Sequence, residues 1–168
     1  MPDTSSGQVF ENKVLNALKS QGFCLSGEHE RFASNKIIIT NKPYTTIYGH
    51  QGKTEFYLQE GNREIRIECK YQDVAGSKIE ALPYLYLNSV ESFPEKEIIL
   101  LFGGNFFEAN KPDNYIKRRQ SQWGCTDWLR KACDSRLYLP DNSEKVIKFM
   151  FYSEFNKWIL DGMPKLVN

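Results

Sequence analysis

The sequence predicts an α/β fold in which a mixed β-sheet is flanked by helices. Its first half has a helical pattern followed by several short segments rich in β-branched and aromatic residues, which are typical of strands. Its second half contains residues 97–102 (EIILLF), and such a continuously apolar run is typical of a parallel strand buried on both faces. Helices and strands therefore share one sheet-based architecture.

Length and composition indicate a single domain over residues 1–168. Hydrophobic residues make up 40% of the chain and aromatic residues 14%, which is enough for a continuous core without a metal or a disulfide. The formal net charge of +1 gives the whole molecule no electrostatic preference for polyanions, so any such preference must be local. We find no secretory signal and no apolar run of membrane-spanning length, and we expect a soluble, cytoplasmic protein.

A first helix is expected over residues 7–21. Ser5 or Ser6 can cap its N-terminus, because a serine hydroxyl accepts a hydrogen bond from a free backbone N–H of the first turn. The apolar stripe of this helix consists of Phe10, Val14, Ala17 and Leu18. At about 100° per residue, Glu11 falls between Leu15 and Leu18. Its carboxylate is therefore directed into or beside the apolar face.

Two pairs of strands are expected after this helix. Residues 36–40 (KIIIT) and 44–48 (YTTIY) form the first pair, separated by a turn at residues 41–43 (NKP). Residues 54–59 (TEFYLQ) and 63–72 (REIRIECKYQ) form the second pair as a hairpin around a Gly-Asn dipeptide, which suits a two-residue turn. A hairpin of this kind fixes which residues of its two strands face each other.

The second half of the chain is expected to add helices and strands to this sheet. A helix begins at Ser77, and Pro83 must lie near its start or kink it, because proline lacks a backbone donor. After the buried strand at 97–102, residues 126–133 form a helix, residues 145–152 (KVIKFMFY) form a strand, and Ser153 caps a last helix (EFNKWIL).

Side chains alternate along residues 63–72, so polar residues gather on one face of this strand. One side carries Ile65, Ile67 and Cys69, and the other carries Arg66, Glu68, Lys70 and Gln72. If the turn has two residues, Glu60 pairs with Arg63. Counting back from the turn then places Glu55 opposite Glu68.

Two opposed carboxylates favour a cation between them. Opposed residues of an antiparallel pair have Cβ atoms about 4.5 to 5.5 Å apart, and like charges at this distance destabilise a sheet. Mg²⁺ prefers carboxylate and water oxygens and usually takes one or two protein carboxylates, with water and substrate phosphate completing its shell. Lys70 lies about 6.6 to 6.8 Å further along the same face and can reach a metal-bound water. This combination meets the requirements of phosphodiester hydrolysis.

Taken alone, a Glu-x-Lys sequence on a strand is most often a solvated face with a weak ion pair. Here it is accompanied by an acid opposite Glu68, by Glu11 on the apolar side of the preceding helix, and by a Gly-Ser helix start. This order of a helix glutamate, a hairpin acid, Glu-x-Lys and a second helix resembles the PD-(D/E)XK nuclease superfamily over residues 7–87. The sequence ECKYQ at residues 68–72, followed by Gly-Ser, is especially similar to restriction endonucleases and to phage- or mobile-element-borne nucleases.

The resemblance implies a restriction-endonuclease-like core with a metal-dependent site. It implies Glu55 and Glu68 as ligands of Mg²⁺, for which Mn²⁺ can substitute. It further implies Lys70 as the residue that positions the attacking water, Glu11 as a supporting acid, and a contribution from Gln72. The first hairpin acid of this family is usually an aspartate after a proline, and here Glu55 takes that place without a preceding proline.

A local basic segment is the candidate for nucleic-acid binding. Residues 111–136 contain seven basic and three acidic residues, with Tyr115, Trp123 and Trp128 among them. Basic residues interleaved with aromatic ones suit phosphate contacts and packing against bases or sugars. A solvated loop and helix with core tryptophans would give the same pattern. Under the nuclease interpretation, the predicted DNA contacts are Lys117, Arg118, Arg119, Arg130 and Lys131.

The sequence thus predicts a Mg²⁺-dependent DNA endonuclease of the restriction or phage type, in a prokaryotic or phage-infected cell. We expect a homodimer, because double-strand cutting needs two sites on opposed strands. Two alternatives stay open: a nuclease-fold subunit that binds DNA or a partner without cutting in a larger defence or recombination complex, and a nuclease acting on RNA or structured DNA. The sequence lacks phosphate-loop spacing, zinc-ligand spacing and a histidine placed near a cysteine, which disfavours nucleotide binding, structural zinc and thiol catalysis.

Overall fold

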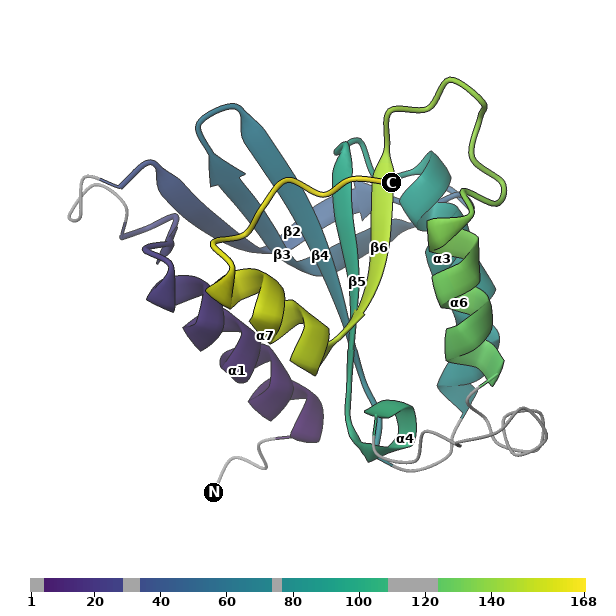
Figure 1. Cartoon of the computed structure of the whole chain (residues 1–168), viewed down its shortest axis with the longest axis horizontal. Helices are drawn as coiled ribbons and strands as arrows, with labels where there is room; N and C mark the ends of the chain where they lie inside the picture. Colours follow the sequence, from purple (N-terminus) through teal and green to yellow (C-terminus); the bar gives the residue numbers. More distant parts are fainter. Residues whose placement is uncertain (1–4, 29–33, 74–76, 109–123) are drawn as a thin grey trace.

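Strands in the described residues form one mixed six-stranded sheet, as the sequence predicts (Figure 1). The computed structural model describes residues 5–28, 34–73, 77–108 and 124–168. Strands β2, β3 and β4 are antiparallel neighbours, β1 runs parallel to β2, and β5 and β6 continue parallel to β4. The strands, whose spatial order equals their chain order, are β1 Cys24–Leu25, β2 Lys36–Thr45, β3 Gln51–Glu60, β4 Arg63–Tyr71, β5 Glu97–Gly103 and β6 Val146–Phe151.

Helices cover both faces of this sheet (Figure 1). Helices α1 and α7 pack together on one face, and α3 and α6 pack together on the other. Their bounds are α1 Ser6–Ser20, the 3₁₀ helix η1 Ser77–Ala81, α3 Leu82–Glu91, α4 Asn105–Glu108, α6 Gly124–Asp134 and α7 Tyr152–Leu160. A helix long and apolar enough to cross a membrane is absent from the described residues.

Strand β5 supplies side chains to the core on both faces of the sheet. Ile99 and Leu101 belong to the cluster beneath α1 and α7. Ile98, Leu100 and Phe102 belong to the cluster beneath α3 and α6. Every residue of β5 is buried, and its neighbours β4 and β6 are both parallel to it. The prediction of a parallel strand buried on both faces is therefore confirmed.

Helix α1 begins and packs as its sequence pattern predicts. The Ser5 hydroxyl accepts the backbone N–H of Gln8 at 3.3 Å and caps the helix. Phe10, Val14 and Leu18 are buried against the sheet. The packing of this stripe sets the rotation of α1, and it leaves Glu11 half-buried beside the apolar face.

Strand β2 is continuous, and the prediction of two strands separated by a turn at residues 41–43 is wrong. Its pairing with β3 keeps one register along its whole length, with an interruption opposite Asn41. Asn41 has a φ of 53°, a left-handed conformation that asparagine tolerates better than most residues, so the strand continues past it. In the described residues, β1 pairs with Ile37 and Ile38 and not with the part of β2 around Pro43. A proline there removes no ladder hydrogen bond to β1.

Pro83 lies near the start of α3 and does not kink it. Pro83 occupies the first turn of α3, where no intrahelical partner for its missing N–H is needed. The five residues before α3 form η1, which begins at Ser77. The predicted helix is therefore present as a 3₁₀ turn followed by an α-helix, without a kink at Pro83.

Helix α7 begins two residues earlier than predicted, at Tyr152 instead of Glu154, and Ser153 is not its cap. The helix starts at Tyr152, so Ser153 lies within the first turn. The carboxylate of Glu154 accepts the backbone N–H of Phe151 at 2.8 Å and satisfies the residue before the helix. A glutamate at the third position of a helix commonly accepts the backbone N–H of the residue before the helix. The prediction that Ser153 caps this helix is therefore wrong.

Gly104, directly after β5, lies close to the backbone of Gln72, directly after β4. We expect Gly104→Ala to destabilise the fold by about 2 to 3 kcal/mol. Its φ is +98°, and a Cβ there would lie 2.4 Å from the backbone oxygen of Gln72. Gly61→Ala is the matched control, because Gly61 also has positive φ but its added Cβ meets nothing within 4 Å. Urea unfolding of both variants should show a smaller loss of stability, about 1 kcal/mol, for Gly61→Ala. Equal losses would contradict the close-contact explanation.

Candidate active site

The site lies where β4 extends beyond its pairing with β3. Pairs between these strands end at Phe56↔Ile67. Beyond this point β3 continues as the partner of β2 as far as Gln51, whereas β4 continues beside β5 as far as Tyr71. In the described part of the chain, residues 68–71 of β4 therefore have one edge that faces no other strand. The two strands diverge, and the exposed edge is available to a ligand.

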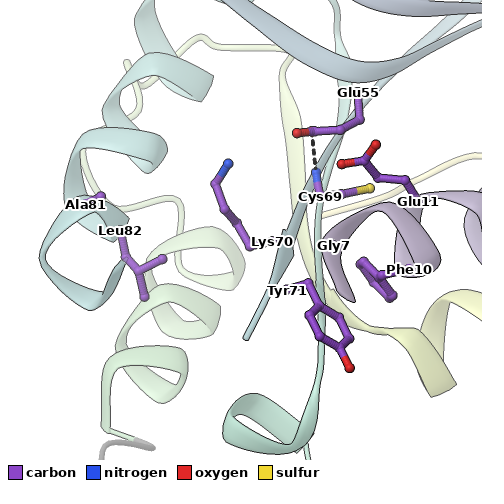
Figure 2. A pocket seen from close by; sticks show the side chains of 9 residues that line it. All are labelled: Gly7, Phe10, Glu11, Glu55, Cys69, Lys70, Tyr71, Ala81 and Leu82. Atoms are coloured by element: carbon purple, nitrogen blue, oxygen red, sulfur yellow. Dashed lines mark hydrogen bonds between the residues drawn. The ribbon is translucent and has the colours of Figure 1, made fainter. Parts of the chain in front are cut away.

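Glu55 binds this edge with its side chain. Its Oε2 atom accepts the backbone N–H of Cys69 at 2.8 Å, in the place where a carbonyl of a paired strand would accept it (Figure 2). The predicted hairpin register is correct, since Glu60 pairs with Arg63, but the ladder ends one residue before Glu55 and Glu68 would pair. The role of the Cys69 N–H has no signal in the sequence, because every residue other than proline carries the same group.

A cavity of about 320 Å³ opens at this edge. Its walls include Glu11 from α1, Glu55 from β3, Cys69 and Lys70 from β4, and Leu82 from α3. Figure 2 shows the carboxylates of Glu11 and Glu55 directed toward each other on one side of β4. The Lys70 side chain extends on the other side of β4, in the space between β4 and Leu82 of α3. The cavity thus brings together three of the five predicted catalytic residues.

Glu68 contacts Lys70 and does not line the cavity itself. Its side chain is only 6% exposed, and its Oε1 atom accepts a hydrogen bond from Lys70 Nζ. The other oxygen, Oε2, is buried and accepts no hydrogen bond from any group in the described residues. A buried carboxylate oxygen without a donor is costly. Glu68 therefore has one oxygen that remains available for a cation.

Burial raises the pKa of Glu68 to about 7. The Lys70 ammonium opposes this rise, while the charge of the nearby Glu55 carboxylate adds to it. The pKa of Glu11 is also raised, first by burial and then by the charge of Glu55, and Lys70 acts against both. These mutual effects show that the three acids and Lys70 share one electrostatic environment.

Burial alone would lower the pKa of Lys70, but the nearby carboxylates of Glu68 and Glu55 outweigh it and raise the pKa. Lys70 therefore keeps its proton at neutral pH. An ammonium group of this kind can donate hydrogen bonds and offset negative charge, and it cannot act as a general base.

The acidic residues fit a hard divalent cation. Glu55 and Glu68 offer carboxylate oxygens, and the buried Oε2 of Glu68 lacks a hydrogen-bond donor in the described residues. No group of three or more histidine, cysteine, aspartate or glutamate side chains in those residues is arranged as a closed metal site. Mg²⁺ does not need one, because it usually binds one or two carboxylates and keeps several waters.

Two other polar residues, Arg66 on β4 and Gln72 directly after it, make contacts that connect parts of the fold. Arg66 is 1% exposed and forms a two-point ion pair with Glu95, at 2.5 and 2.8 Å. Gln72 is 8% exposed and does not line the cavity. Its backbone N–H donates to the backbone oxygen of Gly103 at 3.1 Å, and its backbone oxygen accepts the N–H of Phe106 at 3.0 Å. Gln72 thus joins the end of β4 to the segment after β5.

The predicted DNA contacts divide between described and undescribed parts of the chain. Lys117, Arg118 and Arg119 lie outside the described residues. Arg130 donates to both carboxylate oxygens of Glu154, at 2.9 and 2.8 Å, and its guanidinium lies over aromatic rings of β6. Lys131 is exposed on α6. Arg130 therefore links α6 to α7, and its contact with DNA stays a prediction.

Residues 3–111 match the family model described as the PD-(D/E)XK nuclease superfamily domain. The matched segment contains Glu11, Glu55, Glu68 and Lys70, together with β5. No curated protein and no solved structure matches the chain. The family match spans well over half of the 168 residues, and it includes the diverging strands β3 and β4, which carry Glu55, Glu68 and Lys70. The chain belongs to the PD-(D/E)XK nuclease superfamily.

Proposed function

We propose that this protein is a Mg²⁺-dependent endonuclease that hydrolyses DNA phosphodiester bonds. The observation that supports this proposal most directly is the set of Glu11, Glu55, Glu68 and Lys70 around the open edge of β4. Nuclease chemistry is the activity of the superfamily. The divalent metal and the DNA substrate are the specific parts of the proposal.

Glu55 and Glu68 would hold the metal. When bound there, Mg²⁺ would polarise the phosphate and lower the pKa of a water molecule. Glu55 is already fixed for this role by its hydrogen bond to Cys69 N–H, so little side-chain freedom is lost when a ligand binds.

Lys70 supplies a permanent positive charge beside the scissile phosphate. It remains protonated, so it can orient a water molecule by donating to it and can stabilise the charge that develops on the phosphate oxygens. Glu11 reaches the same cavity from α1. Its pKa is raised, first by burial and then by the charge of Glu55, which suits its carboxyl group to carrying a proton.

The cellular setting and assembly belong to the proposal as well. A homodimer would place two such sites on opposed DNA strands, as a restriction- or phage-type enzyme in the cytoplasm requires for double-strand cutting. Light scattering of the purified protein with and without DNA measures this directly. A monomer in both conditions would leave single-strand nicking as the expected product.

Replacing Lys70 should abolish cleavage without preventing folding. We expect Lys70→Met to lower the cleavage rate of plasmid and linear DNA in Mg²⁺ by about 10²- to 10³-fold, the size of effect found when a preorganised donor is removed. Lys148→Met is the matched control, because its side chain is 25% exposed against 28% for Lys70 and it also lies near a carboxylate, Asp134. The control should cut at the wild-type rate, and EDTA should stop both.

The same assay separates the alternatives. Wild-type protein that binds DNA in Ca²⁺ but cuts no nucleic acid in Mg²⁺ or Mn²⁺ would overturn the proposal in favour of a binding subunit. Cutting confined to RNA or to branched DNA would keep the chemistry and change the substrate. Equal losses of cleavage rate in Lys70→Met and Lys148→Met would show that the effect is not specific to Lys70, which contradicts the assigned site.

A further inference from the structure

A second cavity of about 530 Å³ adjoins the active-site cavity. The two cavities share Phe10 and Tyr71 as wall residues, so they adjoin at these two rings. Figure 2 shows the Tyr71 hydroxyl pointing away from Glu55, with the Phe10 ring beside the Tyr71 ring. We call this second cavity the flanking groove; its other lining residues used below are Lys13, Asn105 and Tyr152.

The wall between the active site and the flanking groove is held in place. The Tyr71 hydroxyl donates to the carboxylate of Asp73, with distances of 2.8 and 2.9 Å to its two oxygens. The same carboxylate accepts the backbone N–H of Asn105 at 3.1 Å. The Phe10 ring packs on Gly103, where a Cβ would lie 2.4 Å from it. A preorganised wall of this kind can position a ligand with little loss of conformational entropy.

The flanking groove differs chemically from the active site. Its described lining contains no acidic residue, whereas the active-site cavity contains two, Glu11 and Glu55. Its cation is Lys13, whose Nζ lies 3.9 Å from the centre of the Tyr152 ring. The charge of Asp73, which lies nearby, is engaged by Tyr71 and by the Asn105 N–H. Aromatic rings with one cation suit a nucleotide, because the rings pack on base or sugar and the cation pairs with phosphate.

We propose that the flanking groove binds the nucleotide next to the scissile phosphate, with Tyr71 and Tyr152 against its sugar or base and Lys13 on its phosphate. This inference rests on the proposed function and adds a substrate subsite to it. A polynucleotide chain that leaves the active site across Tyr71 enters this groove directly, because the two cavities share that wall. Lys13 is then a positioning residue, distant from the reacting atoms.

Lys13→Ala and Lys19→Ala test the inference as a matched pair. Both lysines are exposed on α1, but only Lys13 lines the groove, so the two changes remove the same charge from the same helix. The measurement is the affinity for a fluorescent duplex oligonucleotide in Ca²⁺ across a series of salt concentrations, followed by cleavage kinetics in Mg²⁺. Each phosphate contact contributes about 0.9 to the slope of log affinity against log salt on duplex DNA.

We expect Lys13→Ala to lower that slope by about 0.9 and to raise KM several-fold with little change in kcat. Lys13→Arg should restore both values, and Lys19→Ala should match the wild type. Equal slopes in all variants, together with cleavage by the wild type, would overturn the subsite and support the proposed function. Binding without cleavage, with a lower slope for Lys13→Ala alone, would support the subsite and overturn the nuclease. A wild type that binds no nucleic acid would overturn both.

Discussion

Glu68→Gln is expected to abolish cleavage and, at the same time, to make the metal-free protein more stable. The loss of cleavage follows from the loss of one of two carboxylates available to a metal, and we expect at least about a 10³-fold lower rate. A glutamine retains the shape of the side chain and its capacity to accept from Lys70. The variant therefore separates a missing charge from a missing contact.

The gain in stability follows from the pKa of Glu68. Burial raises this pKa from the ordinary value of 4.5 to about 7, so the folded protein holds the charged form less favourably than the unfolded chain does. The resulting contribution to stability is complete below pH 4.5 and is lost as the pH rises through 7. At pH 8 the wild type should therefore be less stable than Glu68→Gln by about 2 to 3 kcal/mol.

Urea unfolding of both proteins in EDTA, at pH 8 and near pH 4.5, measures this effect. The difference should be present at pH 8 and should be nearly gone near pH 4.5, where Glu68 is protonated in the folded protein and about half protonated in the unfolded chain. Glu64→Gln on the same strand is the control, because Glu64 is exposed and should change stability little at either pH. A Glu68→Gln protein less stable than the wild type at pH 8 would show that the pair with Lys70 outweighs the burial of the charge.

The sequence predicted the polar face of β4 because side-chain alternation is a local property of a strand. Arg66, Glu68 and Lys70 do lie on the face opposite Ile65 and Ile67, and the two-residue turn set the register correctly. Hydrophobic continuity likewise predicted that β5 is buried on both faces. These features depend on neighbouring residues and need no knowledge of the rest of the chain.

The divergence of β3 from β4 could not be predicted in this way. The ladder ends at Phe56↔Ile67 because β3 follows β2 while β4 follows β5, and this depends on the whole sheet. The position of the Glu55 carboxylate on the Cys69 N–H is a consequence of that divergence. The continuity of β2 through Asn41 could not be predicted for a related reason. The sequence Asn-Lys-Pro at residues 41–43 favours a turn, and only pairing with β3 on both sides of Asn41 continues the strand.

The buried pair of Arg66 and Glu95 should be the most sensitive point of the fold outside the apolar core. Arg66 is 1% exposed and Glu95 4%, and the guanidinium also lies 5.0 Å from the ring centre of Phe93. Arg66→Met leaves the Glu95 carboxylate buried without its partner, and removal of one member of such a pair typically costs about 3 to 5 kcal/mol. We expect the variant to be largely unfolded or to melt far below the wild type.

Thermal and urea unfolding check this expectation against an exposed pair. Lys96 and Glu144 also form an ion pair, but both side chains are 73% exposed, so Lys96→Met should cost less than about 1 kcal/mol. The double variant Arg66→Met/Glu95→Leu should recover much of the lost stability, because no buried charge is left without a partner. Similar losses in Arg66→Met and Lys96→Met would contradict the buried-charge explanation.

The double variant also tests what the pair does for the active site. Arg66 Nη1 donates to the Thr54 hydroxyl at 2.9 Å and to the Lys42 backbone oxygen at 3.3 Å. It therefore connects β4 to β3 and β2 just beyond the point where the β3–β4 pairing ends. Thr54 precedes Glu55, and apolar replacements cannot make these hydrogen bonds. We therefore expect the folded double variant to cut DNA at least about tenfold more slowly than the wild type, because Glu55 is no longer held in register. Full activity would show that the Cys69 N–H positions Glu55 without help from Arg66.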